Sequence, residues 1–287
     1  MEIRDIIRQN KKYEGCRSDF TQARIVLYGA GFDGTSSYRA GSRFAPMAIR
    51  SETYFAQEDY SPYFDRVLTE KPVHDLGDVE IIFGNTAGTL QRIQTVSEYI
   101  VNHNKIPVCM GGEHLITLPA ITPLIKKYPN LQVVQLDAHL DLMDELFGDK
   151  LSHGAVMRRI YELLESAGRI YQIGVRSGNK DEYAFAASHT HLFPFDTAGF
   201  LDVADTLRGK PVYLTIDLDV FDPSLIPGTG TPEAGGIFFP QYIELLKKLD
   251  HLNIVGADVV ELSPHIDSTQ VSTIVASKIL RELLLII

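Results

Sequence analysis

The sequence predicts one α/β domain in which a parallel sheet is covered by helices on both faces. Short runs of valine, isoleucine and leucine recur along the chain, and amphipathic stretches separate them. Continuous apolar runs of this kind are typical of strands buried on both faces. No linker, internal repeat or low-complexity segment divides the 287 residues, a length that can bury a large core. We therefore expect a single domain over residues 1–287.

The apolar runs predict six strands. They cover residues 24–28, 106–110, 131–136, 170–175, 212–216 and 253–260. The amphipathic stretches predict helices over residues 86–102, 154–167 and 240–249. The apolar C-terminal segment 279–287 is interrupted by charged side chains and is too short to span a bilayer. It predicts a helix packed in the core or at a subunit contact.

Composition and net charge limit which binding partners and which cellular compartment the protein is expected to have. A formal net charge of −10 disfavours nucleic acid or an anionic membrane as a partner, and suits a small cationic substrate better. Cys16 and Cys109 show no pairing pattern, which suits a reducing compartment. The N-terminal residues lack the apolar core of a secretion signal. We therefore expect a cytoplasmic protein.

Acidic side chains and histidines follow several of the expected strands. Asp137, His139 and Asp141 alternate after the run 131–136, and alternating strand residues point to one face. Asp217 and Asp219 follow another run eighty residues later. Because the carboxyl ends of parallel strands meet at one edge of the sheet, these side chains should gather in one cleft. Four aspartates there would repel each other unless cations lay between them, and two divalent cations would balance their charge.

Manganese fits this set best, with iron, cobalt, nickel or zinc as alternatives, because the ligands are mostly carboxylates with one or two imidazoles. His114 is a further candidate ligand. A structural zinc site is disfavoured because no cysteine lies nearby. A calcium loop is disfavoured because its repeating pattern fails at residues 220–221. The remaining alternative is that the polar residues only end strands in solvated loops.

A literal G-x-G-x-x-G motif at residues 29–34 follows a strand, but no helix begins where its N-terminus would face a pyrophosphate. The next helix is expected only near Pro46, a favoured first-turn residue. A glycine-rich loop that lines the cleft is therefore favoured over dinucleotide binding.

The remaining histidines differ in their context. His189 and His191 lie in a polar, loop-like segment and are expected at the surface. His153 lies only twelve residues beyond Asp141, and an imidazole near a metal site can move protons at neutral pH. It could alternatively serve only to begin a helix. Glu233, in a loop rich in glycine and threonine, is either a substrate contact or solvated.

The joint set of motifs resembles the ureohydrolase (arginase/agmatinase) family. The motifs are Gly112-Glu-His114, Asp137-Ala-His-Leu-Asp141, Ser152-His-Gly154, Asp217-Leu-Asp-Val-Phe-Asp-Pro223, Gly230-Thr-Pro-Glu233 and Val260-Glu-Leu-Ser-Pro264, preceded by a glycine, arginine and proline signature from Gly34 to Arg50. The match runs in order from about residue 24 to 265 and is highly specific. It implies a three-layer α/β/α sandwich around a central, mostly parallel sheet, and a homo-oligomer, either a trimer or a hexamer.

The resemblance also implies two manganese ions in each subunit. His114, Asp137, Asp141 and Asp217 would hold one ion. His139, Asp137, Asp217 and Asp219 would hold the other, with two aspartates bridging. The implied reaction is attack of a hydroxide, bridging the two metals, on a guanidinium carbon, which releases urea and an amine.

Three further roles are carried by the same resemblance. Glu261 would bind the guanidinium through paired charge-assisted hydrogen bonds. Asp141 would pass a proton to the departing amine, and His153 would exchange protons with solvent.

The loop between Asp141 and His153 favours agmatine, which would yield putrescine, as the substrate. Met143 and Leu151 stand where arginases have side chains that bind an α-carboxylate. Instead Asp144, Glu145 and Asp149 make this loop acidic, which would attract a terminal amine. A solvated charged loop is the alternative reading.

Other functions remain open at this level. The substrate could be guanidinobutyrate, guanidinopropionate, arginine or formiminoglutamate, and Arg176 is a candidate partner for a substrate carboxylate. A metal-dependent amide hydrolase similar to deacetylases is disfavoured because such enzymes normally need one metal. A non-catalytic binding protein is disfavoured because His153 and Glu261 accompany all six ligands. Glu113 departs from the aspartate more usual in the family, without removing a ligand.

Overall fold

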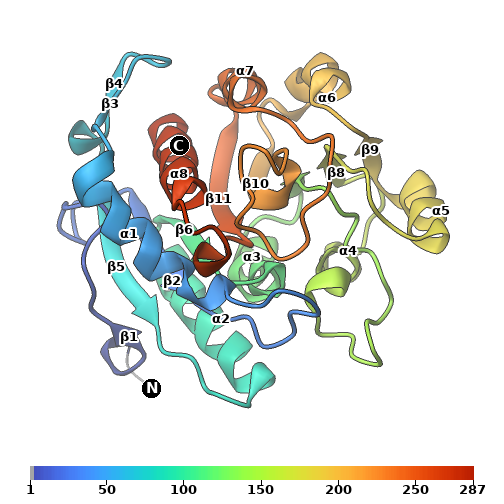
Figure 1. Ribbon diagram of the computed structural model, residues 1–287, viewed down its shortest axis with the longest axis horizontal. Helices are drawn as coiled ribbons and strands as arrows, with labels where there is room; N and C mark the ends of the chain where they lie inside the picture. Colours follow the sequence, from blue (N-terminus) through green and yellow to red (C-terminus); the bar gives the residue numbers. More distant parts are fainter. Residues whose placement is uncertain (1–2) are drawn as a thin grey trace.

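The computed structural model describes residues 3–287 and is built around a nine-stranded sheet (Figure 1). The order of strands across the sheet is β1-β5-β2-β6-β11-β10-β7-β8-β9. All neighbours pair in parallel except β1, which runs antiparallel to β5 at one edge. The strands are β1 (Ile7–Arg8), β2 (Ile25–Ala30), β5 (Val73–Val79), β6 (Ile106–Gly111), β7 (Gln132–Leu136), β8 (Ile170–Ile173), β9 (His191–Phe193), β10 (Pro211–Asp217) and β11 (Asn253–Val260). A separate hairpin pairs β3 (Tyr60–Ser61) with β4 (Arg66–Val67).

Helices cover the sheet on both faces, so the molecule has three layers, as expected from the sequence. One apolar core contains residues of α1 (Ala45–Ala56), α6 (Ala198–Val203), α7 (Phe239–Leu249) and α8 (Val271–Ile286). The other contains residues of α2 (Thr86–Asn102), α3 (Thr117–Lys127), α4 (Val156–Leu164) and α5 (Lys180–His189). The helices α1 and α8 lie side by side in the first of these layers (Figure 1).

All six expected strands are present, with ends shifted by a few residues at most. The central strands β6, β7, β10 and β11 are buried almost throughout, which is why their sequences read as continuous apolar runs. The strand β5 was not expected. Its burial alternates along its length and it carries two aspartates and a glycine, so no apolar run marks it.

The C-terminal segment forms the end of α8 and is buried in the core, one of the two expected positions. Within residues 3–287, no helix combines the length and apolarity needed to cross a membrane. The expected loop around His189 was wrong. His189 ends α5, which begins with a capping box between Asn179 and Glu182, and His191 begins β9. The segment is polar, so no apolar run in the sequence predicted the helix or the strand.

A buried ion pair joins α1 to strand β5. The Arg50 guanidinium is fully buried, and its Nε and Nη2 donate to the two Asp75 carboxylate oxygens at 2.7 and 2.8 Å. It also contacts Asp78. The backbone N–H of Tyr13 donates to Asp75 at 2.8 Å, so the N-terminal segment depends on the same carboxylate. The arrangement fixes α1 and the N-terminal segment around Tyr13 against β5, the strand next to the edge of the sheet.

Removal of Arg50 should destabilise the fold. Arg50→Met leaves the buried Asp75 without its counter-charge, and loss of one partner from such a pair typically costs about 3–5 kcal/mol. Urea-induced unfolding, followed by circular dichroism, measures the change. The control is Arg17→Met, which removes an exposed pair with Glu14 and should change the free energy of unfolding little. Equal stability of the two variants would contradict the structural role assigned to Arg50.

Candidate metal centre

The site lies where four neighbouring strands of the sheet end. His114 follows β6, Asp137 follows β7, Asp217 ends β10, and Glu261 follows β11. These strands are adjacent in the order β6-β11-β10-β7, although they lie far apart in the sequence. The carboxyl ends of parallel strands thus bring the four segments together, as the sequence analysis predicted.

Asp137, His139 and Asp141 converge through a loop and not through a strand. The expectation that strand alternation would align them was wrong, because β7 ends at Leu136, before the motif begins. Asp141 has a φ of 52°, in the left-handed region that residues other than glycine rarely adopt. The backbone N–H of His139 donates to Asp137 Oδ1 at 2.6 Å and tightens the turn. The left-handed turn is what returns Asp141 toward His114.

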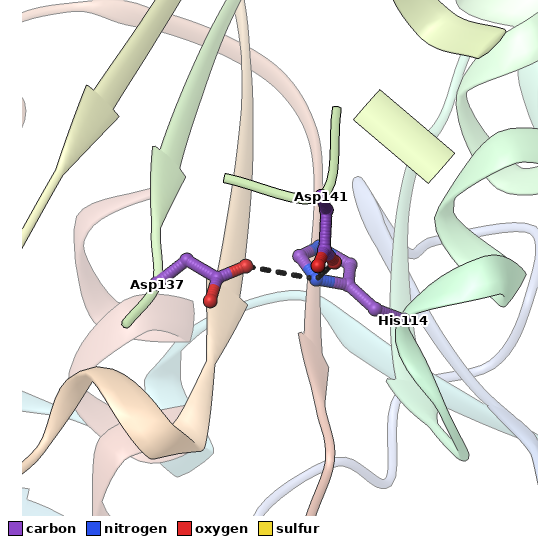
Figure 2. Close-up of side chains that lie close together, drawn as sticks. All are labelled: His114, Asp137 and Asp141. Carbon is purple, nitrogen blue, oxygen red and sulfur yellow. Dashed lines mark ion pairs between the residues drawn. The ribbon is translucent and has the colours of Figure 1, made fainter. Parts of the chain in front are cut away.

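The His114 imidazole is buried among three carboxylates. Its Nδ1 lies 3.1 Å from an oxygen of Asp137 and 3.0 Å from one of Asp141 (Figure 2). It also lies 3.3 Å from an oxygen of Asp217. Nδ1 of His114 makes no hydrogen bond of good geometry within the described residues. Three oxygens that converge on one ring nitrogen form the donor set of a divalent cation.

The opposite side of the His114 ring fixes which nitrogen carries the hydrogen. The Thr215 hydroxyl donates to the Asp258 carboxylate at 2.6 Å, so it can only accept from His114 Nε2, which lies 2.9 Å away. Nε2 therefore carries the hydrogen in the neutral ring, and Nδ1 presents its lone pair to the carboxylates. Metal-ligating histidines are typically oriented by such a bond at the other nitrogen, so this chain fits a metal at Nδ1.

A second group of ligands lies beside the first. His139 Nδ1 lies 2.9 Å from Asp219 Oδ2 and 3.6 Å from Asp137 Oδ1. His114, Asp137 and Asp141 form one possible metal-binding group, and Asp137, His139 and Asp219 form another. Asp137 belongs to both groups, so one carboxylate is shared between the two possible sites.

Further hydrogen bonds hold the carboxylates in place. Gln135 donates to Asp137 Oδ2 at 2.6 Å, and the Gln172 amide donates to Gln135 at 2.8 Å. The backbone N–H of Ala138 donates to Asp219, and that of Asp219 donates to Asp217. Because a carboxylate oxygen has two lone pairs, an oxygen that accepts one of these bonds can still bind a cation.

Protons occupy this cluster when no cation is bound. Burial lowers the pKa of His114, but the three aspartate carboxylates around Nδ1 outweigh it and hold that pKa well above its ordinary value. The pKa of His139 is raised in the same way, against burial, chiefly by the charge of Asp219. Burial and the charge of Asp137 raise the pKa of Asp141 to about 7. A bound cation would balance the carboxylate charge in place of these protons.

Glu261 is held at the edge of this cluster. Its Oε1 accepts the backbone N–H of His114 at 2.7 Å, and its φ of 66° is left-handed. Burial and the neighbouring Glu113 carboxylate raise the pKa of Glu261 well above its ordinary value. A half-buried carboxylate with a raised pKa, held in an unfavourable backbone conformation, indicates a functional position.

His153 reaches the same pocket from the start of α4. It begins a short 3₁₀ turn at residues 153–155, directly before that helix. The structure is therefore compatible with both roles expected for His153, proton transfer and the start of a helix. Its Nε2 lies 3.2 Å from Ser37 Oγ, while Nδ1 is buried without a hydrogen bond to any described residue. Burial lowers the pKa of His153, so the ring is neutral at neutral pH.

The residues expected to bind the substrate lie in different environments. Asp144 and Glu145 are exposed and do not line the pocket, and Asp144 pairs with Arg159 and Lys150. Glu233 lies at the rim, where it accepts from Ser177 Oγ at 3.0 Å, and it is 4.0 Å from His139 Nε2.

Arg176 has no free donor for a substrate. Its five N–H groups are directed at the backbone carbonyls of Gly174, Asp219, Val220, Glu233 and Ala234, at 2.7–3.2 Å. The guanidinium therefore ties the Glu233 loop to the strand end that carries Asp219. A role in binding a substrate carboxylate is not compatible with these bonds.

The pocket beside the metal-ligand cluster has a volume of about 390 Å³. Its lining includes six residues of the sequence-based site together with several that were not singled out. The latter are Ser37, Leu140, Met143, Leu146, Gly154, Ser177, Gly178, Asn179, Glu182 and Thr231. Glu182 is the important omission, because it is a buried carboxylate on the pocket wall. Its spacing from Asn179 marks a capping box in the sequence, but nothing there indicates that the box faces a pocket.

Binding of a divalent cation should release protons. Because the pKa values of His114 and Asp141 are raised in the metal-free cluster, bound protons must leave near neutral pH when a cation replaces them. The affinity should therefore rise with pH, and His114→Asn should weaken it. Isothermal titration calorimetry with Mn²⁺ in buffers of different ionisation enthalpy measures the proton count. Heats that do not vary with the buffer, together with an unchanged affinity between pH 6 and 8, would contradict this account.

Comparison with known proteins agrees with the geometry. The arginase family profile matches residues 23–286. The agmatinase of Bacillus cereus is 40% identical over 93% of this chain and 92% of its own, and the N(1)-aminopropylagmatine ureohydrolase of Thermococcus kodakarensis is 39% identical over 84% and 83%. The crystal structure of the agmatine ureohydrolase of Thermoplasma volcanium superposes with a TM-score of 0.85 at 30% identity, over 98% of this chain and 95% of that one. The chain belongs to the arginase family.

Proposed function

We propose that this protein is an agmatinase that hydrolyses agmatine to putrescine and urea with two manganese ions bound in each chain. The observation that carries the proposal is the half-buried Glu261 carboxylate on the wall of a pocket that also contains Asp141, Asp217 and Asp219. The relationship to the Bacillus cereus agmatinase supports the choice of substrate.

The ligands proposed for the two ions are those expected from the sequence: His114, Asp137, Asp141, Asp217, His139 and Asp219. Carboxylate and imidazole donors without a thiolate suit manganese. The ions would supply Lewis-acid activation of water and of the guanidinium carbon, which resonance otherwise makes a poor electrophile. The protein contributes by fixing the ligands, through Thr215, Gln135 and the backbone N–H groups described above.

Glu261 binds the guanidinium in this proposal. The raised pKa of Glu261 indicates that its carboxylate is costly to ionise inside the pocket. A guanidinium beside the carboxylate is the cation that best favours its ionised form. Two parallel N–H groups of a guanidinium can donate to the two oxygens of one carboxylate in a single plane. This contact orients the guanidinium carbon toward the cluster of ligands.

Asp141 and His153 handle protons. Asp141 lines the pocket, so it is placed to take the proton released by the attacking water and deliver it to the departing amine nitrogen. His153 is neutral and lines the same pocket, so it can exchange a proton with solvent. Cleavage of the carbon–nitrogen bond leaves the amine with that proton and yields urea.

The pocket favours a substrate whose far end is positive. None of the lining residues, all within the described part of the chain, is a lysine or arginine, and Arg176 is fully occupied. We assign Glu182, a buried carboxylate of the pocket lining that lies on α5, to the substrate amine. Asp144 and Glu145, exposed outside the pocket, would attract the amine at longer range, and Glu233 would contact it at the rim.

The first test is urea release from a panel of guanidines by manganese-loaded protein. We expect agmatine to be turned over best, with arginine and guanidinobutyrate at least tenfold poorer in kcat/KM, because their carboxylates meet no positive side chain. Preference for guanidinobutyrate would refute the proposed substrate while leaving the reaction class intact. No urea from any guanidine, with metal bound, would refute the proposed reaction.

A charge-matched pair of variants tests the role of Glu182. Glu182→Gln should lower kcat/KM for agmatine about tenfold, by loss of one charge–charge contact, and should change that for guanidinobutyrate much less. Asp181→Asn is the control, because Asp181 is the exposed neighbouring acid at the start of α5. A parallel loss on both substrates would indicate only damage to the helix cap and would contradict the assignment.

A further inference from the structure

The loop after β2 lies between the end of β6 and the catalytic histidine. Its residues 35–37 contact Glu113 on one side and His153 on the other. Glu113 directly precedes the ligand His114, and its carboxylate is fully buried. One strand end therefore carries a metal ligand and also anchors this loop.

On the Glu113 side the loop supplies three donors. The backbone N–H of Thr35 donates to Glu113 Oε2 at 2.9 Å, and Ser36 Oγ donates to the same oxygen at 3.1 Å. The Thr35 hydroxyl donates to Glu113 Oε1. A buried carboxylate with several charge-assisted hydrogen bonds is a rigid anchor.

On the other side the loop meets His153 twice. The Thr35 hydroxyl, which donates to Glu113, accepts the backbone N–H of His153 at 3.1 Å. Ser37 Oγ lies 3.2 Å from His153 Nε2 and fixes one edge of the ring. The backbone and the ring are thus both set by neighbouring loop residues, and Nδ1 remains the nitrogen without a partner among the described residues.

We propose that Glu113, Thr35 and Ser37 are positioning residues that hold the His153 imidazole in the orientation required for proton transfer. The inference rests on the proposed role of His153. Loss of the Ser37 contact would free the ring to rotate, and loss of the Thr35 contact would release the backbone from which the ring projects. A misplacement of about 1 Å can cost about a hundredfold in rate. The effect should fall on kcat, since none of the bonds described in this linkage is made to the substrate.

Thr35→Val and Thr35→Ser form the decisive pair. Valine keeps the shape and removes the hydroxyl, whereas serine keeps the hydroxyl. Thr35→Val should lower kcat for agmatine about tenfold with KM within about twofold, and Thr35→Ser should restore most of the activity. Thr95→Val is the control, because it removes a threonine hydroxyl bond on α2, outside the site, and should leave kcat unchanged.

The His153→Asn background shows whether the loop acts through the histidine. In that background Thr35→Val should cost no further activity, because the ring it positions is gone. An equal loss in both backgrounds would overturn the proposal. Ser37→Ala provides the same test at an exposed residue whose loss should not affect folding.

A measurement independent of activity separates this inference from the proposed function. The ¹⁵N shifts of the His153 ring in metal-free protein, assigned by their loss in His153→Asn, report its tautomer and hydrogen bonding. Thr35→Val and Ser37→Ala should change these shifts or their pH titration, and Thr95→Val should not. Unchanged shifts in both loop variants would overturn the positioning role even if agmatine is the substrate. Changed shifts without urea release would support it while refuting the proposed reaction.

Discussion

The arrangement of charge at the end of the sheet is the constraint on which the rest of the site depends. Asp137, Asp141, Asp217 and Asp219 are all buried within one cluster. Such a group persists only if protons or cations compensate it, since an isolated buried carboxylate is very costly. The pKa values of His114 and His139 are raised by the same carboxylates, so the cluster favours positive charge. The cluster is therefore suited to hold cations.

Four strands bring the aspartates and histidines together because these strands are parallel and adjacent. The strands β6, β11, β10 and β7 lie next to one another, so their carboxyl ends form one edge. Each end supplies backbone N–H groups as well as side chains, and some of these donate to the aspartates. The strands themselves are apolar and fully packed, which makes the edge rigid. Rigid placement is what metal coordination requires.

The sequence predicted the layers, the six central strands and the cluster of ligand residues, because buried parallel strands and chemical motifs leave local patterns. It did not predict β5, whose alternating polar residues belong to the Arg50 ion pair rather than to an apolar run. It also placed Asp141 by strand alternation, whereas a left-handed turn brings it to His114. Glu182 and the link from Glu113 through Thr35 to His153 escaped prediction because they join segments far apart in sequence through hydrogen bonds. Such contacts have no local signature.

Charge balance also bears on the choice of substrate. The four aspartates, together with Glu261 and Glu182 on the pocket wall, carry six negative charges when ionised. Two divalent cations would neutralise four of them and leave two. Agmatine carries two positive charges, one at each end, whereas arginine carries a net charge of one and guanidinobutyrate none. A substrate with a guanidinium at one end and an amine at the other therefore matches the sign of the charges that remain, one on Glu261 beside the aspartates and one on Glu182 of α5.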